Sequence, residues 1–244
     1  MTERVFIAMP SGSGKPDIDC VASMNSTVLD FQEHGKERPD VRFIHGNCYV
    51  HLCRNLLTHE FMKTDCSHLF FWDDDVAAPA GALRRLLAYD RDIMVAPYPK
   101  KVSPGLPPTK TWPYSLADGV PDALGLLECD MVATGFLLIK RRVIETLYEK
   151  HADRVFYHEP YKSEVVDLFP TGLIPDFPKN GIGKPMWWGE DYAFSVLAQR
   201  AGFKMWLDPV IQLLHAGRNV WAGNFAKSAA DPGWEPASKM DSAA

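Results

Sequence analysis

The chain has 244 residues, of which 46% are hydrophobic and 23% are charged, as in an ordinary globular protein. This composition argues against extended disorder, and the length is enough for one large domain with its own core. A formal net charge of −5 argues against a dedicated nucleic-acid-binding protein, because such proteins usually carry a strongly basic face.

The first hundred residues alternate between strand-like and helix-like patterns. Short apolar runs predict four buried strands, at Val5–Met9, Val41–Ile44, Leu69–Trp72 and Ile93–Ala96. Capping residues and helical spacing predict helices from Asp17 or Asp19 to about Glu33, over Val50–Met62, and from Pro79 onward. This alternation predicts an α/β fold with a mostly parallel sheet covered by helices.

The second half of the chain is less regular. Residues 97–125 are rich in proline and residues 151–188 in aromatic side chains, so we expect two long loops that form a binding surface. The predicted strands and helices around these loops are Cys129–Ile139, Arg141–Glu149, Glu190–Ala201, Phe203–Leu207 and Ile211–Leu214. We expect a single domain over 1–227, with halves 1–100 and 101–227, and a loose tail over 228–244.

The five cysteines form no Cys-x-x-Cys pair, and their number is odd. This pattern favours reduced thiols over a zinc cluster or a disulfide framework. The first ten residues show no signal peptide, and no apolar run approaches the roughly 20 residues that a membrane helix needs. We therefore expect a cytoplasmic protein of a bacterium or a virus, without a membrane span.

Ligands of parallel α/β sheets bind beyond the carboxyl ends of the strands. This rule places Pro10 and Ser11, which follow the first predicted strand, on the same rim as Asn47 and the acidic run Asp73–Asp75. Crowded carboxylates raise each other's pKa, and a hard divalent cation relieves their repulsion. The run therefore predicts a Mn(II) or Mg(II) site, with a solvated acidic turn as the alternative.

Two downstream segments carry residues suited to the same chemistry. His215 follows the last predicted strand and is a candidate metal ligand together with Asp73 and Asp75, although a lone histidine there is often structural. Glu190 and Asp191 stand at the start of a predicted helix, where carboxylates are also ordinary caps. In the functional interpretation, Asp191 is a general base and Glu190 orients the group that attacks.

Four further positions are candidate binding residues. Arg54 and Asn55 lie early in a predicted helix and either reach a phosphate-bearing ligand or form an exposed pair. Gly135 interrupts a predicted strand, which indicates close approach of a ligand or a bulge. Trp188, like Trp187, offers a flat face for stacking or for core packing. The chain has neither a complete P-loop motif nor a Gly-x-Ser-x-Gly elbow.

Together these motifs resemble those of GT-A glycosyltransferases. Asp73-Asp74-Asp75 is similar to their Asp-x-Asp motif, and Gly189-Glu190-Asp191 is similar to the Glu-Asp acceptor motif of inverting members. His215 resembles their late metal-binding histidine. Arg54-Asn55 resembles a pair found in small family-2-like transferases of bacteria and phages. The resemblance covers roughly residues 4–220 and implies a Rossmann-like GT-A fold.

The resemblance implies an enzyme that moves a sugar from a nucleotide diphosphate sugar, expected to be a UDP-sugar, to an acceptor hydroxyl with inversion. Asp73 would contact the donor, Asp75 and His215 would bind the metal, and Asp191 would be the base. The Pro10-Ser11 segment would hold the nucleoside. The other candidate donor-binding residues are Asn47, Arg54, Asn55, Asp74, Gly135 and Trp188.

The nucleotide base and the acceptor stay open. At the end of the second predicted strand, where these transferases usually have an acidic residue, the chain has His45 and Asn47. The acceptor is either a glycan or lipid-linked sugar, or a hydroxymethylated base of phage DNA. Lysines of the two long loops are candidates for contacts with DNA phosphates, or serve solubility alone. They are Lys100, Lys101, Lys110, Lys179 and Lys184.

Three other functions share part of this pattern. A haloacid-dehalogenase-like phosphohydrolase also has an Asp-x-Asp motif after an apolar strand, but that motif usually lies near the start of the chain. It also requires Thr or Val two places after the second Asp, where this chain has Val76-Ala77 after Asp75. A nucleotidyltransferase shares the sheet and the metal chemistry. A catalytically silent sugar-nucleotide-binding module shares the donor site.

Overall fold

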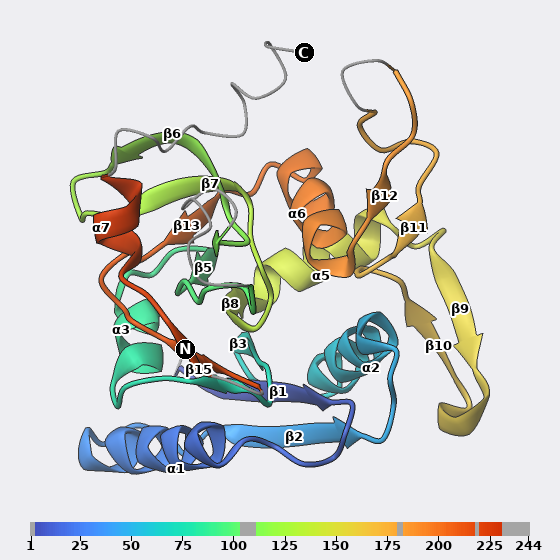
Figure 1. The fold of residues 1–244 in the computed structure, drawn as a ribbon. Coiled ribbons are helices and arrows are strands. Elements are labelled where there is room, and N and C mark those ends of the chain that lie inside the picture. Colours follow the sequence, from blue (N-terminus) through green and yellow to red (C-terminus); the bar gives the residue numbers. More distant parts are fainter. Residues whose placement is uncertain (1–2, 103–110, 180–182, 218–219, 231–244) are drawn as a thin grey trace.

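The computed structural model describes residues 3–102, 111–179, 183–217 and 220–230. The strands of its central sheet are β1 (Val5–Ser11), β2 (Asp40–His45), β3 (His68–Trp72), β5 (Ile93–Val95), β6 (Ser115–Pro121), β7 (Leu127–Met131), β8 (Phe136–Lys140) and β13 (Met205–Leu207). In space these eight strands lie in the order β2-β1-β3-β8-β5-β13-β7-β6 (Figure 1).

Most strands of this sheet run in one direction. β1 pairs in parallel with β2 and β3, and β5 pairs in parallel with β13. β8 lies antiparallel between β3 and β5, and β7 lies antiparallel between β13 and β6. β7 and β8 therefore run opposite to the other strands. The α/β fold class that the sequence predicts is confirmed, with these two reversed strands inside the sheet.

Helices cover both faces of the sheet. They are α1 (Ile18–Glu33), α2 (Val50–Met62), α3 (Ala82–Ala88), α5 (Arg141–Lys150), α6 (Glu190–Arg200) and the short α7 (Phe225–Ala229). Figure 1 shows α3 on one side of the sheet and α2, α5 and α6 on the other. Among the described residues, no helix combines the length and the apolar character that crossing a membrane requires.

The helix starts follow local chemistry. Asp17 caps α1, because its side chain accepts a hydrogen bond of 2.9 Å from the backbone N–H of Asp19. The prediction that Pro79 opens the next helix is wrong. α3 begins at Ala82, after Gly81 turns the chain with a φ of +80°, a conformation that favours glycine.

An aromatic cluster in the core supports the end of β3. The ring of Phe136 on β8 packs edge to face against Phe70 and Trp72 of β3, with centroids 4.7 and 5.0 Å apart. All three side chains are fully buried. Such pairs are favoured by the ring quadrupoles and fix the strand against its neighbour. The core therefore holds the backbone rigidly at the position where Asp73 leaves the sheet.

The single strand predicted over Cys129–Ile139 is wrong. The chain forms β7 and β8 instead, and these lie at separate places in the sheet. Residues 132–135 leave the ladder because their polar backbone groups find other partners. The N–H of Gly135 donates to the Tyr98 hydroxyl at 3.0 Å, and its carbonyl accepts from the N–H of Asp73 at 2.9 Å.

The two predicted long loops contain short strands. β6 lies within the proline-rich stretch, and the aromatic stretch forms two hairpins (Figure 1). These hairpins pair β9 with β10 and β11 with β12, and their sequence patterns are too short to show a period. The bounds are β9 (Val155–His158), η1 (Glu159–Tyr161), β10 (Ser163–Val166), β11 (Gly172–Leu173) and β12 (Trp187–Trp188).

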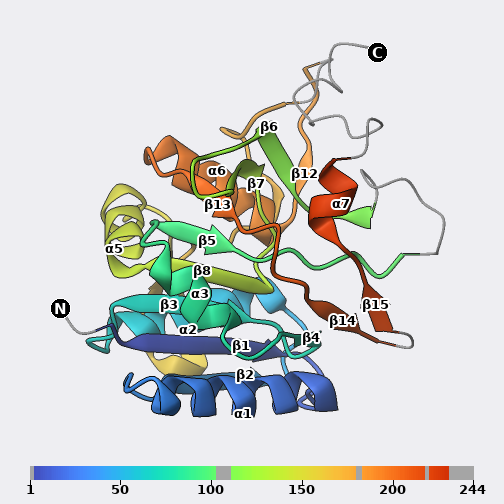
Figure 2. The ribbon, with the colours of Figure 1, turned by 90° about the vertical axis from the view of Figure 1, so that its left-hand side faces the viewer.

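A small second sheet joins the end of the chain to the region after β3. It contains β4 (Val76–Ala77), β14 (Leu214–Ala216) and β15 (Val220–Ala222), in the order β15-β14-β4 (Figure 2). The strand predicted at Ile211–Leu214 therefore lies later, at β14. The predicted loose tail begins inside α7, and residues 231–244 lie outside the described residues.

Candidate active site

The acidic run follows β3 and lines a cavity of about 180 Å³. Pro10 comes to this cavity from the end of β1, and Asn47 comes from the turn between β2 and α2. The carboxyl ends of neighbouring parallel strands meet at one edge of a sheet, which explains the convergence. Three of the segments that the sequence places on one rim, Pro10, Asn47 and Asp73–Asp75, do line one cavity.

The three aspartates have three different partners. The Oδ1 atom of Asp73 accepts a hydrogen bond of 2.9 Å from Arg54 Nη2. Asp74 Oδ2 accepts a short bond of 2.5 Å from the hydroxyl of Ser11, whose side chain is buried. Asp75 pairs with the ammonium group of Lys101, which comes from the chain after β5. The carboxylates thus face different sides of the rim.

Their pKa values differ accordingly. Burial raises the pKa of Asp73, and the neighbouring Arg54 offsets only part of that effect. Burial also raises the pKa of Asp74, against the hydrogen bond from Ser11. Burial alone would also raise the pKa of Asp75, but the hydrogen bonds from His215 and Lys101 outweigh burial and lower this pKa. Asp75 is therefore the member of the run that is most firmly ionised at neutral pH.

The small second sheet brings His215 to Asp75. β14 pairs with β4 so that His215 stands opposite Val76, and its Nε2 atom lies 3.4 Å from Asp75 Oδ1. Its Nδ1 atom lies 2.7 Å from the carbonyl oxygen of Pro99. Both ring nitrogens of His215 therefore have a partner, the Pro99 carbonyl at Nδ1 and the Asp75 carboxylate at Nε2. A metal ion held by Asp75 and His215 would take the place of the contact between Nε2 and Asp75.

The expected three-residue metal set is not assembled in the described part of the chain. Asp73 is turned toward Arg54, and no group of three His, Cys, Asp or Glu side chains among the described residues is placed to hold a metal ion. The pair that remains is Asp75 with His215, and the cation beside it is Lys101. Two protein ligands leave room for ligands from a substrate.

Arg54 and Gly135 lie behind Asp73. The Arg54 side chain is only 3% exposed, and its Nε atom lies 3.7 Å from Glu190 Oε1. A Cβ atom at Gly135 would lie 2.5 Å from the Tyr98 hydroxyl and 2.7 Å from Asp73 Oδ2, so a larger residue fits only if one of these side chains moves. The close approach expected at Gly135 is thus made by the protein's own side chains.

Asn55 has a full set of partners within the protein. Its amide nitrogen donates to Asp167 Oδ1 at 2.6 Å, and its oxygen accepts from the N–H groups of Leu168 and Phe169 at 2.9 and 3.1 Å. The side chain is 1% exposed. These contacts tie α2 to the segment after β10, and they account for Asn55 without a ligand.

Glu190 and Asp191 begin α6, as the sequence predicts. Gly189 is the N-cap, and Asp191 Oδ1 accepts a hydrogen bond of 2.8 Å from the N–H of Tyr192. Burial, with a further contribution from the charge of Glu190, raises the pKa of Asp191 to about 6. A carboxylate with this pKa is ionised at neutral pH and is a stronger base than an ordinary aspartate, which suits it to general base catalysis.

The two neighbouring tryptophans differ in exposure. Trp188 is 6% exposed and packs edge to face against Phe177, with ring centroids 5.5 Å apart. It is therefore a core residue rather than a stacking face. Trp187 is 76% exposed and stands opposite Leu173 in the β11–β12 hairpin. Trp187, four residues before Asp191 in the chain, therefore presents the more exposed aromatic face of the two.

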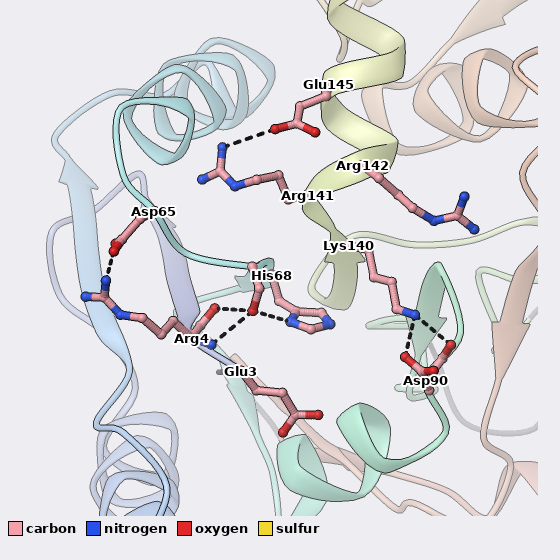
Figure 3. A pocket seen from close by; sticks show the side chains of 10 residues that line it. Glu3, Arg4, Asp65, His68, Asp90, Lys140, Arg141, Arg142 and Glu145 are labelled. Carbon is pink, nitrogen blue, oxygen red and sulfur yellow. Dashed lines mark hydrogen bonds and ion pairs between the residues drawn. The ribbon is translucent and has the colours of Figure 1, made fainter. Parts of the chain in front are cut away.

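A larger cavity, of about 610 Å³, lies at the other end of the same strands (Figure 3). Its lining includes the first residue of β3, His68, and the last residue of β8, Lys140. Each of its four lysine and arginine side chains already pairs with a carboxylate, so the cavity presents no free cluster of charge. The pairs are Arg4 with Asp65, Lys140 with Asp90, Arg141 with Glu145 and Arg142 with Asp92.

Two residues of the site were not singled out for it from the sequence. Tyr98 fills the space beside Gly135 and contacts the His215 ring, with centroids 4.9 Å apart. Lys101 was noted only as a loop lysine, but it pairs with Asp75. Both follow β5, whose carboxyl end lies on the same rim. That position is the signal that points to them.

No protein-family model and no curated protein matches the chain. Several solved structures are similar to it in chain path, at very low identity. A197 from STIV shows 16% identity over 91% of this chain and 95% of that one, with a TM-score of 0.49. UDP-glucose pyrophosphorylase complexed with UDP-glucose shows 8% identity over 94% and 96%, with a TM-score of 0.44. A glycosyltransferase involved in glycosylation of the major capsid of PBCV-1 shows 9% identity over 59% and 62%, with a TM-score of 0.31.

Proposed function

We propose that the protein is a GT-A-type glycosyltransferase that moves a sugar from a UDP-sugar to an acceptor hydroxyl with inversion. One observation carries this proposal. Asp73 of the cavity lined by Asp73–Asp75 pairs with the buried Arg54, which also lies 3.7 Å from Glu190. Glu190 directly precedes Asp191, a carboxyl group whose pKa is raised to about 6. A polar cavity and a carboxyl group of raised pKa are the elements that group transfer to a hydroxyl needs.

The residues of the site divide the reaction between them. Pro10 and Asn47 line the wall against which the nucleoside of the donor would lie. Asp191 takes the proton from the acceptor hydroxyl as its oxygen attacks the anomeric carbon of the sugar. The bond between that carbon and the diphosphate breaks, and the nucleoside diphosphate leaves with the electron pair. Attack opposite to the leaving group inverts the configuration at the anomeric carbon.

A divalent metal fits part of this site. Asp75 and His215 would hold Mn(II) or Mg(II), because Asp75 is ionised and the imidazole Nε2 faces it. When bound, the ion neutralises charge that develops on the diphosphate. Lys101 pairs with Asp75 and lies where that ion would compete with it. Asp73 stays with Arg54 and outside this ligand set.

The acceptor that we propose is a glycan, or a lipid-linked sugar, with a hydroxymethylated DNA base as the alternative. Trp187, four residues before the proposed base in the chain, has an exposed aromatic face, and sugar rings stack on such faces. Lys101 is engaged by Asp75, and Lys110 lies outside the described residues. Binding to duplex DNA that weakens with salt would favour the DNA base, because phosphate contacts release counterions.

The test is release of UDP from a panel of UDP-hexoses, measured with Mn(II), with Mg(II) and with EDTA. We expect UDP release that EDTA suppresses, and loss of that release in the Asp191→Asn variant. Asp130→Asn is the matched control, because Asp130 is another aspartate with a pKa raised by burial, on β7. No UDP release from any donor, together with an aspartyl-phosphate trapped on Asp73 or Asp75, would overturn the proposal.

A further inference from the structure

Arg54 is the buried cation that lies between the two acidic halves of the proposed site. It comes from the second turn of α2, and its guanidinium group meets Asp73 from β3 and Glu190 from α6. The distances are 2.9 Å from Nη2 to Asp73 Oδ1 and 3.7 Å from Nε to Glu190 Oε1. A planar guanidinium can serve two carboxylates at once, because its donors point in fixed, separate directions.

The guanidinium group is closed off from a ligand in the cavity. It is 3% exposed, and its central carbon lies 5.3 Å from the ring centroid of Phe71. Arg54 is also absent from the residues that line the cavity of the acidic run, whereas Asp73 is present. A phosphate group in that cavity therefore meets the carboxylates first. The sequence suggested that Arg54 contacts the donor phosphates. The buried position of its guanidinium group does not support that contact.

The bonding of Arg54 is costly for the folded state. Within the described residues, its buried Nε and Nη1 atoms have no hydrogen-bond partner. Each unmet buried donor destabilises the folded state, because it has lost its hydrogen bonds to water. A residue that only stabilised the fold would be better replaced by an apolar side chain of similar size. This loss of stability is explained if the Arg54 guanidinium is needed to hold Asp73 and Glu190 in place.

We propose that Arg54 is a positioning residue, which sets the spacing between Asp73 on the donor side and Glu190 on the acceptor side. Arg54 pairs with these two carboxylates and forms no ion pair with Asp191. This inference rests on the proposed function. The charged and titratable groups that face Asp191 are Glu190 and Tyr192 on its own helix, Arg54 from α2, and Tyr98 and Tyr114 from the chain after β5. Arg54 is the cation among them.

The first experiment compares Arg54→Met with the wild type. We expect kcat to fall about 100-fold, since a misplaced reacting group costs about that much, while KM for the UDP-sugar changes less than about threefold. A residue that bound donor phosphates would instead raise KM strongly. Arg84→Met is the matched control, because it removes an arginine that bonds Asp30 on the far side of the sheet. Its kcat should stay within about twofold of the wild type.

The second experiment needs no turnover. The carboxyl resonance of Asp191 is followed by ¹³C NMR across pH in the wild type, in Arg54→Met and in Arg54→Lys. Loss of the positive charge should move the pKa of Asp191 upward, because the charge favours the ionised form. Arg54→Lys keeps the charge, so its Asp191 pKa should stay near that of the wild type. Its kcat should still fall at least about 10-fold, because one ammonium cannot span both carboxylates.

The outcomes separate the two proposals. A raised KM with unchanged kcat in Arg54→Met, or an Asp191 titration that does not move, would overturn the positioning role. If Arg54→Met does not fold, the comparison of Arg54→Lys with the wild type decides the same question. If the wild type shows no turnover with any donor, the proposed function fails, and the NMR titration still decides whether the charge of Arg54 acts on Asp191.

Discussion

Asp73, Asp74 and Asp75 are identical side chains in a row, yet the fold makes them different groups. The pKa is raised by burial for Asp73 and Asp74, whereas contacts with His215 and Lys101 lower it for Asp75. The difference arises because the backbone after β3 turns the three carboxylates toward different partners. This difference is the reason why we propose Asp75 as the cation ligand of the run and Asp73 as a carboxylate held in place by Arg54.

The first residue-scale prediction concerns Asp191. Replacing it by Asn should lower kcat about 100-fold or more, because proton transfer by a positioned base contributes at least that factor. In the wild type, activity should fall as pH drops through about 6, since the carboxyl group is then protonated and no longer a base. Initial rates across pH test both points. The residual activity of Asp191→Asn should not fall as pH drops through about 6. Full activity of this variant would contradict the assignment of Asp191 as the base.

The second residue-scale prediction concerns Gly135. In Gly135→Ala the new methyl group would overlap the Tyr98 hydroxyl and the Asp73 carboxylate, so one of them must move. We expect a loss of about 1–3 kcal/mol in the free energy of unfolding, together with weaker donor binding. Denaturant unfolding and calorimetric UDP titration measure these effects. Gly12→Ala is the stability control, because its added methyl meets nothing nearer than the Asn47 carbonyl at 3.6 Å.

At the scale of elements, α2 links the donor rim to the hairpins of the second half. Asn55 ties it to the segment after β10 through three hydrogen bonds. Asn55→Ala leaves the buried N–H groups of Leu168 and Phe169 without partners, which should cost about 3 kcal/mol of stability. Thermal unfolding measures the loss, and hydrogen exchange should show it over residues 167–169. Unchanged exchange there would contradict this role.

A second contact between elements predicts a pH dependence. Asp30 of α1 accepts from Arg84 of α3 at 2.9 and 3.1 Å, and the hydrogen bond from Arg84 lowers the pKa of Asp30. A lowered folded-state pKa adds stability above the unfolded value of about 4 and loses it as pH falls through the folded value. Asp30→Asn should therefore lower the melting temperature at pH 7, with a difference that shrinks below about pH 4. A constant difference across pH would refute this linkage.

At the scale of the whole molecule, the proposed donor and metal bind the folded state alone. Adding UDP with Mn(II) should therefore raise the melting temperature. At a ligand concentration 100 times the dissociation constant, the free energy of unfolding rises by about 2.7 kcal/mol. The site draws on β1, β3, α2 and β14, so the bound donor should stabilise the entire domain. Differential scanning fluorimetry tests this. Asp75→Ala should remove the part of the shift that depends on Mn(II), and an undiminished shift would exclude Asp75 as a ligand.

The sequence by itself determined the elements whose signals are local. α2 spans Val50–Met62 as predicted, and the four strands that short apolar runs predict in the first hundred residues lie at β1, β2, β3 and β5. Their order also predicts that Pro10, Asn47 and Asp73 share a rim, because parallel strands end at one edge. Spacing within a turn or a strand is enough for such predictions, since the residues that interact lie close together in the chain.

Only the tertiary structure decided how distant residues meet. The break between β7 and β8 depends on partners in Tyr98 and Asp73 that no local pattern shows. The pairing of β14 with β4 sets His215 beside Asp75, and the chain after β5 adds Lys101 to the same carboxylate. The spacing of charges in the folded state sets each pKa and each ligand set, and this spacing arises from packing between elements rather than from residue order.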